Sequence, residues 1–91
     1  MVMGLPFNEK IKDGFYIRTF SSDVTNEDLK WHWDEEDRIV VCENKTDWGF
    51  QMDNNLPFII SKDSPIFIPK GQFHRLIKGT GDLTLRIKKI D

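Results

Sequence analysis

Hydrophobic and polar residues alternate along most of this chain with the period of a β-strand. Segments with this alternation, or with a short apolar run, lie at residues 15–20, 29–34, 38–42, 48–52, 57–61, 66–68, 73–77 and 83–88. Residues that favour turns separate them, and no segment has the apolar period of a long helix. Short strands at such even spacing predict an all-β fold in which two antiparallel sheets form a small sandwich or barrel.

Two of the predicted strands, residues 39–41 and 58–60, are apolar on both faces, so we expect them to be covered on both sides around a lined interior. The barrel is expected to span residues 14–91. Residues 1–13 mix glycine, proline, asparagine and charged residues, and they are predicted to form an N-terminal arm that is either poorly ordered or an edge segment.

Composition supports one compact domain and excludes several classes of partner. The chain has 91 residues, of which 38% are hydrophobic and 12% aromatic, enough for a small core. A net charge of −2 provides no basic field for nucleic acid or anionic lipid. No apolar run is long enough for a signal peptide or a membrane span, so a cytoplasmic protein is expected.

The cysteine and the tryptophans read as packing residues. Cys42 is the single cysteine, which excludes an intramolecular disulfide and a multi-cysteine metal site, and its strand predicts a small core side chain. Trp31, Trp33 and Trp48 lie at alternate positions of predicted strands, which favours packing in the core or at a subunit interface over a stacking platform.

Candidate chemistry begins at the segment that follows the apolar run 66–68. Pro69 and Gly71 predict a tight corner, because proline fixes its own φ and glycine supplies backbone freedom. The strand after the corner places His74 and Leu76 on one face. A histidine is thus delivered onto an apolar surface, as a structural group paired with a backbone carbonyl or as a binding residue.

A second group of polar residues lies in the segment 29–34. His32 and Asp34 alternate with apolar neighbours and are expected to share one face of a strand, and Arg38 follows four residues later. The acidic run 35–37 between them is predicted to be a solvated turn.

Together these two segments resemble the cupin superfamily. Its second motif, with P-x-G-x-x-H at its centre, is matched at Pro69, Gly71 and His74, and the histidine that opens its H-x-H pair is matched at His32. The resemblance covers about residues 29–90 and implies a jelly-roll barrel. Five other motif positions differ and carry Asp34, Arg38, Lys45, Asp63 and Lys78.

The resemblance also implies a ligand set, which this chain alters. Metal-bearing cupins hold a divalent ion with three histidines and a glutamate, whereas the matching positions here are His32, Asp34, Arg38 and His74. Arginine does not coordinate metals. One interpretation keeps His32, Asp34 and His74 as the two-histidine, one-carboxylate face of an iron(II) oxygenase. Arg86 would then receive the carboxylate of a 2-oxo acid.

Two further interpretations remain open. In a metal-free barrel Arg38 pairs with Asp34 or another acid, and His32 and His74 line a cavity for a small polar or anionic ligand. Alternatively, His32, His74 and one acid from the segment 34–37 hold Fe, Mn, Ni or Zn for isomerase or hydrolase chemistry or as a structural ion. Enzyme and interaction module thus both remain hypotheses, and the resemblance implies a homodimer.

Overall fold

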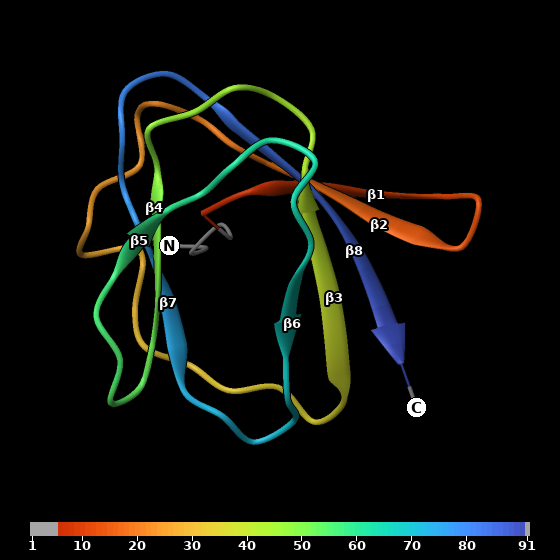
Figure 1. Cartoon of the computed structure of the whole chain (residues 1–91). Coiled ribbons are helices and arrows are strands. Elements are labelled where there is room, and N and C mark those ends of the chain that lie inside the picture. The colour runs from red at the N-terminus through yellow and green to blue at the C-terminus, as the bar shows by residue number, and fades with distance from the viewer. Residues whose placement is uncertain (1–5, 91) are drawn as a thin grey trace, which may run out of the picture.

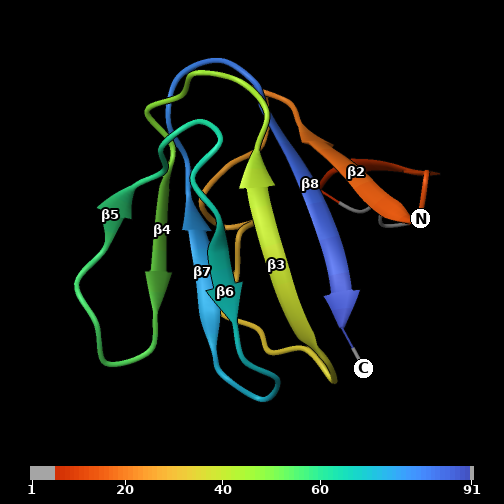
Figure 2. The same cartoon turned by 45° about the vertical axis from the view of Figure 1, so that its right-hand side comes forward.

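The computed structural model describes residues 6–90, which form two antiparallel sheets that face each other (Figures 1 and 2). The strands are β1 (Asn8–Lys12), β2 (Phe15–Phe20), β3 (Asp37–Cys42), β4 (Gly49–Met52), β5 (Phe58–Ile59), β6 (Ile66–Ile68), β7 (His74–Ile77) and β8 (Leu83–Ile90). One sheet has the order β1-β2-β8-β3-β6 and the other the order β5-β4-β7. Across residues 6–90 no helix has the length and apolarity that a membrane crossing needs.

The predicted all-β, double-sheet architecture is confirmed. Strand β8 shows why the alternation was informative, because it lies between β2 and β3 and is paired on both edges. Its residues Leu83, Leu85 and Ile87 are at most 5% exposed and face the space between the sheets. The residues between them point to the outer face, as the period of two requires.

The N-terminal segment contributes to the larger sheet. Strand β1 pairs with β2 as its edge strand, and Phe7 packs against Phe20 with ring centroids 5.3 Å apart. Residues 1–5 of the predicted arm lie outside the part of the chain that the structure describes. The arm therefore adds a strand and an aromatic ring to the same fold.

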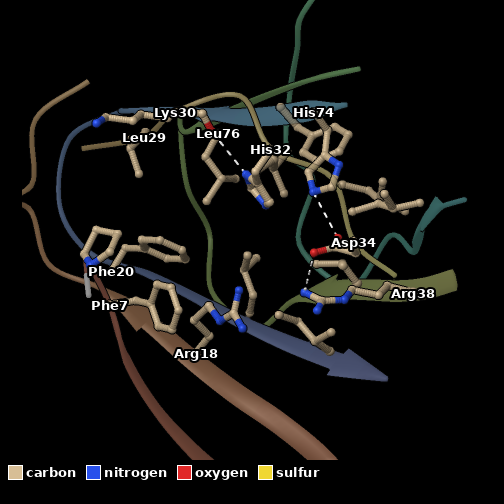
Figure 3. A pocket seen from close by; sticks show the side chains of 18 of the residues that line it. Phe7, Arg18, Phe20, Leu29, Lys30, His32, Asp34, Arg38, His74 and Leu76 are labelled. Carbon is tan, nitrogen blue, oxygen red and sulfur yellow. Dashed lines mark hydrogen bonds and ion pairs between the residues drawn. The ribbon is translucent and has the colours of Figure 1, made fainter. Parts of the chain in front are cut away.

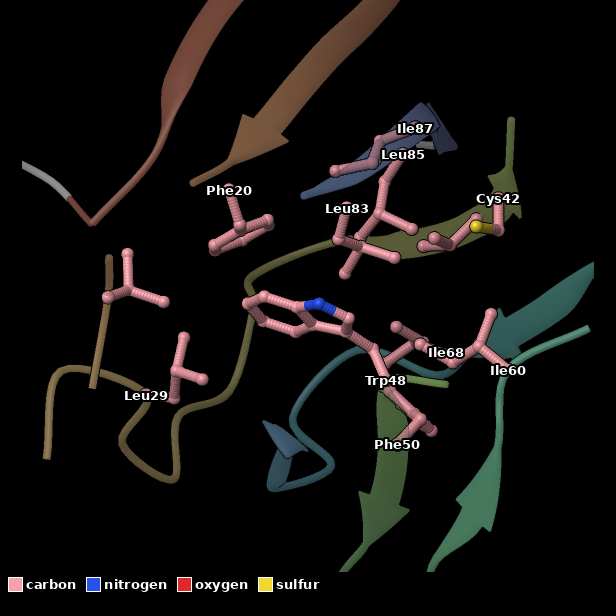
Figure 4. Packing of buried hydrophobic residues seen from close by; sticks show 12 residues of the cluster. Phe20, Leu29, Cys42, Trp48, Phe50, Ile60, Ile68, Leu83, Leu85 and Ile87 are labelled. Atoms are coloured by element: carbon pink, nitrogen blue, oxygen red, sulfur yellow. The ribbon is translucent and has the colours of Figure 1, made fainter. Parts of the chain in front are cut away.

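The core lies between the sheets and is centred on Trp48 (Figure 4). This side chain is fully buried, its ring lies 5.8 Å from that of Phe20, and its Nε1–H donates to the Gly81 carbonyl over 3.1 Å. Burying the indole nitrogen costs little when it has such a partner. Cys42 is also buried, as predicted, and burial raises the pKa of its thiol.

The strand predicted over residues 29–34 is wrong. This segment makes a single bridge, between His32 and His74, and is otherwise irregular. The ladder stops because the Asp34 carbonyl accepts a hydrogen bond from the Gly71 amide, over 2.8 Å, in the corner before β7. Trp31 and Trp33 are consequently 41% and 51% exposed and lie outside the core, unlike Trp48.

Candidate metal centre

Main-chain hydrogen bonds bring the two histidines of this chain together. The amide of His32 donates to the His74 carbonyl over 3.0 Å, and the amide of His74 donates to the His32 carbonyl over 2.9 Å. In such a reciprocal antiparallel pair the two side chains emerge on the same side. The ring centroids lie 4.2 Å apart.

The corner before β7 fixes the third member of the group. Gly71 has a φ of +78°, which glycine adopts without steric cost, so the predicted role of this residue is confirmed. Its amide binds the carbonyl of Asp34, which ties the segment before β3 to the segment before β7. His32, Asp34 and His74 each offer one ligand atom, and these atoms all lie within 4.8 Å of one another.

Both imidazole rings are oriented by a carbonyl two residues earlier in the chain. Nδ1 of His32 lies 3.1 Å from the Lys30 oxygen, and Nδ1 of His74 lies 2.9 Å from the Gln72 oxygen. A carbonyl only accepts, so each Nδ1 carries the hydrogen. In the neutral ring Nε2 then presents a lone pair, which is how metal-binding histidines are commonly held.

Asp34 holds a buried oxygen atom that lacks a donor. Its Oδ1 lies 3.3 Å from Nη1 of Arg38, and its Oδ2 lies 3.3 Å from Nε2 of His74 (Figure 3). The approach to His74 lacks hydrogen-bond alignment, and Oδ2 has no other hydrogen-bond partner in the described chain. A carboxylate oxygen and an imidazole nitrogen that face each other need a cation between them, either a proton or a metal ion.

Arg38 neutralises this site without covering it. Its Nε donates to Glu36 Oε2 over 2.7 Å, while its Nη1 approaches only the Oδ1 atom of Asp34. The pair expected in the metal-free interpretation is therefore present, but it leaves the second oxygen of the carboxylate available. Two carboxylates surround one guanidinium, so the repulsion between Arg38 and a bound cation is offset.

Charge and burial favour the coordinating forms of Asp34 and His32. Burial by itself would raise the pKa of Asp34, but the contact with His74 and the guanidinium of Arg38 outweigh it, and the pKa lies below its ordinary value. The imidazole of His32 is partly desolvated although the residue reaches the surface, which lowers its pKa, and the opposing hydrogen bond to the Lys30 carbonyl does not compensate. A carboxylate and a neutral imidazole are the forms that bind metals.

A cavity of about 350 Å³ adjoins the three residues and opens between the sheets (Figure 3). Its wall is mainly apolar, with side chains from β2, β3, β4, β6, β7 and β8. His32 is the exposed member of the group, and Asp34 and His74 are 8% and 4% exposed. A small organic molecule in this cavity would therefore meet the candidate ligands at one part of its wall.

Two other predictions about site residues are resolved by the fold. Arg86 does not line the cavity, so its predicted role toward a 2-oxo acid is wrong: it points outward from β8, 2.7 Å from Glu43 and over the ring of Phe15. In the acidic run, Glu36 pairs with Arg38 and Asp37 accepts from the Lys70 amide. Glu35 is exposed, and among the described residues Asp34 is the acid that lies within reach of both histidines.

The sequence reasoning missed Arg18, which also lines the cavity. The signal was present, because Arg18 has the same parity as Tyr16 and Phe20 in the strand 15–20. Phe20 proved to be a core residue, so the alternation placed an arginine on the inner face.

No family model matches the sequence, and no curated protein matches it. Solved structures match the fold. DMSP lyase DddQ from Ruegeria pomeroyi DSS-3 aligns with a TM-score of 0.69 and 15% identity, over 85% of this chain and 38% of that one. A putative mannose-6-phosphate isomerase from Ralstonia eutropha JMP134 gives 0.65 and 14%, over 93% and 82%.

The crystal structure of Fe(II) HppE in complex with substrate aligns with a TM-score of 0.67 and 12% identity, over 99% of this chain and 56% of that one. This chain thus spans 38% of DddQ and 56% of HppE. At these identities the likeness concerns the fold.

Proposed function

This chain has the cupin fold of the solved structures that it matches, and we propose that it binds one divalent transition metal ion and a small molecule beside it. The ion would be held by Nε2 of His32, Oδ2 of Asp34 and Nε2 of His74. The observation that carries the proposal is the buried Oδ2 atom of Asp34, which faces Nε2 of His74 without a hydrogen-bond donor. A metal ion would satisfy both atoms at once.

The donor set fits borderline transition metals. Two imidazoles and one carboxylate suit Fe, Mn, Ni or Zn, and one of the matching structures is described as an Fe(II) protein. Three protein ligands leave coordination positions that a substrate or water can fill. When bound, the ion would supply Lewis-acid or redox chemistry, whereas this chain's residues orient the ligands and exclude water through the apolar wall.

The cavity supports an enzyme or a binding protein for a small polar or anionic molecule. The Arg38–Asp34 contact favours a second candidate, a metal-free barrel in which a proton on His74 replaces the ion. The two candidates differ in what occupies the space between Asp34 and His74.

The deciding experiment is a metal titration of the purified protein. We expect elemental analysis to find one divalent ion per chain, and the metal-stripped protein to regain one Co²⁺ with a visible absorption spectrum of low-symmetry coordination. A protein that holds no metal as purified and takes up no Co²⁺ or Zn²⁺ on titration would contradict the proposal and favour the metal-free barrel.

We expect metal affinity to fall in acid, because protons compete with the ion for the imidazoles. An ordinary histidine is half protonated near pH 6.5. Because the pKa of His32 lies lower, protonation of His32 reduces metal affinity only below that pH. Competition titrations with a chelator across this range measure the change, and proton release on binding should grow in parallel. An affinity that stays constant through the range would show that imidazole nitrogens are not ligands.

A further inference from the structure

Arg18 is a charged side chain on the inner wall of the barrel. It lies on β2 opposite Leu85 of β8, and Leu85 is buried and lines the same cavity. The side chain of Arg18 is 14% exposed, and Figure 3 shows it entering the cavity from β2. An arginine at an inward position of a core strand carries a desolvation cost, which calls for a partner.

Its existing partners hold the guanidinium but do not use all of its donors. Glu9, the neighbour of Arg18 across the β1–β2 pair, accepts from Nε over 2.8 Å and contacts Nη2 over 2.6 Å with the same oxygen atom, Oε1. The ring of Phe7 lies 3.9 Å from the guanidinium carbon. Nη1 makes no hydrogen bond to any residue from 6 to 90, so it remains available to a ligand.

The cavity offers an anion two guanidinium groups. Its charged lining residues are three cations and two carboxylates, namely Arg18, Lys30, Arg38, Asp28 and Asp34. Glu9 and Glu36 pair with Arg18 and Arg38 from outside this lining, so a net positive charge at the cavity would come from a divalent ion at the candidate metal centre. Arg18 and His74 come from different sheets, so a ligand held by the arginine can extend across the cavity toward the metal centre.

We propose that Arg18 anchors the carboxylate of a small, mainly apolar organic acid whose other end faces His32, Asp34 and His74. The proposal deepens the proposed function. It rests on that function only for the metal ion that the far end of the ligand would contact. A carboxylate accepts two hydrogen bonds from a guanidinium in a planar arrangement, and the apolar wall suits a hydrocarbon body. Phe7, whose ring lies 3.9 Å from the guanidinium carbon, would then act as the positioning residue, while the Glu9 carboxylate competes with the ligand for the guanidinium.

The test uses hexanoate and its neutral counterpart hexanamide, with binding measured by calorimetry on the full chain. We expect hexanoate to bind the wild type and hexanamide to bind at least about tenfold more weakly, because a charged hydrogen bond is lost. Arg18→Gln should weaken hexanoate binding by about tenfold or more without affecting hexanamide. Arg18→Lys keeps the positive charge but loses the two parallel N–H donors of the guanidinium, so its affinity for hexanoate should lie between those of the wild type and Arg18→Gln.

Glu9→Gln is the matched control, because it breaks the same ion pair and leaves the guanidinium in place. If Arg18 serves only to join β1 to β2, Arg18→Gln and Glu9→Gln will lower the unfolding temperature equally, and both variants will bind hexanoate with the same affinity. That result would overturn the proposal, as would a wild type that fails to bind hexanoate. The expected result is hexanoate binding that Glu9→Gln preserves or strengthens.

Measurements with and without Zn²⁺ separate this proposal from the metal proposal. Loss of hexanoate affinity in Arg18→Gln without metal would support the anchor even if no ion binds. If hexanoate binds only the Zn²⁺ form and Arg18→Gln does not weaken it, the carboxylate coordinates the metal instead. The anchor would then be wrong while the metal centre stands.

Discussion

Replacing His74 with alanine is expected to abolish stoichiometric metal binding and to weaken residual affinity by about a hundredfold or more. Loss of an orienting group alone commonly costs metal sites ten- to a hundredfold, and His74 is itself a candidate ligand. Its ring also contacts His32 and lies 5.7 Å from Phe50, so its removal loosens the neighbouring ligand. Elemental analysis and Co²⁺ titration measure the effect.

Phe73→Ala is the matched control for this variant. Phe73 is the adjacent residue, but it is 45% exposed and does not line the cavity. It should retain one ion per chain, and circular dichroism should show that both variants are folded. If His74→Ala binds metal as tightly as the wild type, then the contact between His74 and Asp34 is a structural ion pair and the proposed centre is wrong.

Replacing Trp48 with alanine is expected to lower the free energy of unfolding by about 3–5 kcal/mol, the range for large aromatic residues in cores. Trp48 is fully buried between the sheets, and its truncation also leaves the Gly81 carbonyl without its donor. Domains of this kind are commonly stable by only about 5–15 kcal/mol, so the variant should be marginal. Urea unfolding followed by circular dichroism measures the loss.

Trp33→Ala provides the comparison, since Trp33 is 51% exposed. Exposed substitutions usually change stability by no more than about 0.5 kcal/mol. Trp48→Phe should cost less than Trp48→Ala because it retains most of the ring. Equal losses in Trp48→Ala and Trp33→Ala would contradict the placement of the core.

The sequence predicted the fold well because strand periodicity is a local signal. Each apolar position on β8 faces the core, and the alternation specified that face without any knowledge of the partner strands. The corner at Pro69 and Gly71 was also predictable from local sequence. Proline fixes its own φ, and two residues later Gly71 adopts the left-handed φ that glycine tolerates. The cupin resemblance built on these residues is confirmed at the level of the fold.

The residues of the candidate site could be predicted from the sequence, but the backbone structure that brings them together could not. His32, Asp34 and His74 were singled out through the cupin resemblance, and the structure places them together, but the segment around His32 forms a single bridge and not a strand. That outcome depends on hydrogen bonds to the distant segment 71–74, which local periodicity does not encode. Parity, by contrast, did distinguish the two arginines, because Arg18 shares the inward face of Phe20 while Arg86 alternates with the buried residues of β8.

The reciprocal main-chain hydrogen bonds between His32 and His74 make the spacing of the two histidines largely independent of the residues that line the cavity. Peptide groups, whose geometry is the same for every side chain, set the spacing of the two imidazoles. The side chains of the apolar barrel wall make neither of these two hydrogen bonds. Substitutions in the wall, apart from Phe50 that stacks on His74, can therefore change which molecules fit while the two histidines keep their main-chain link.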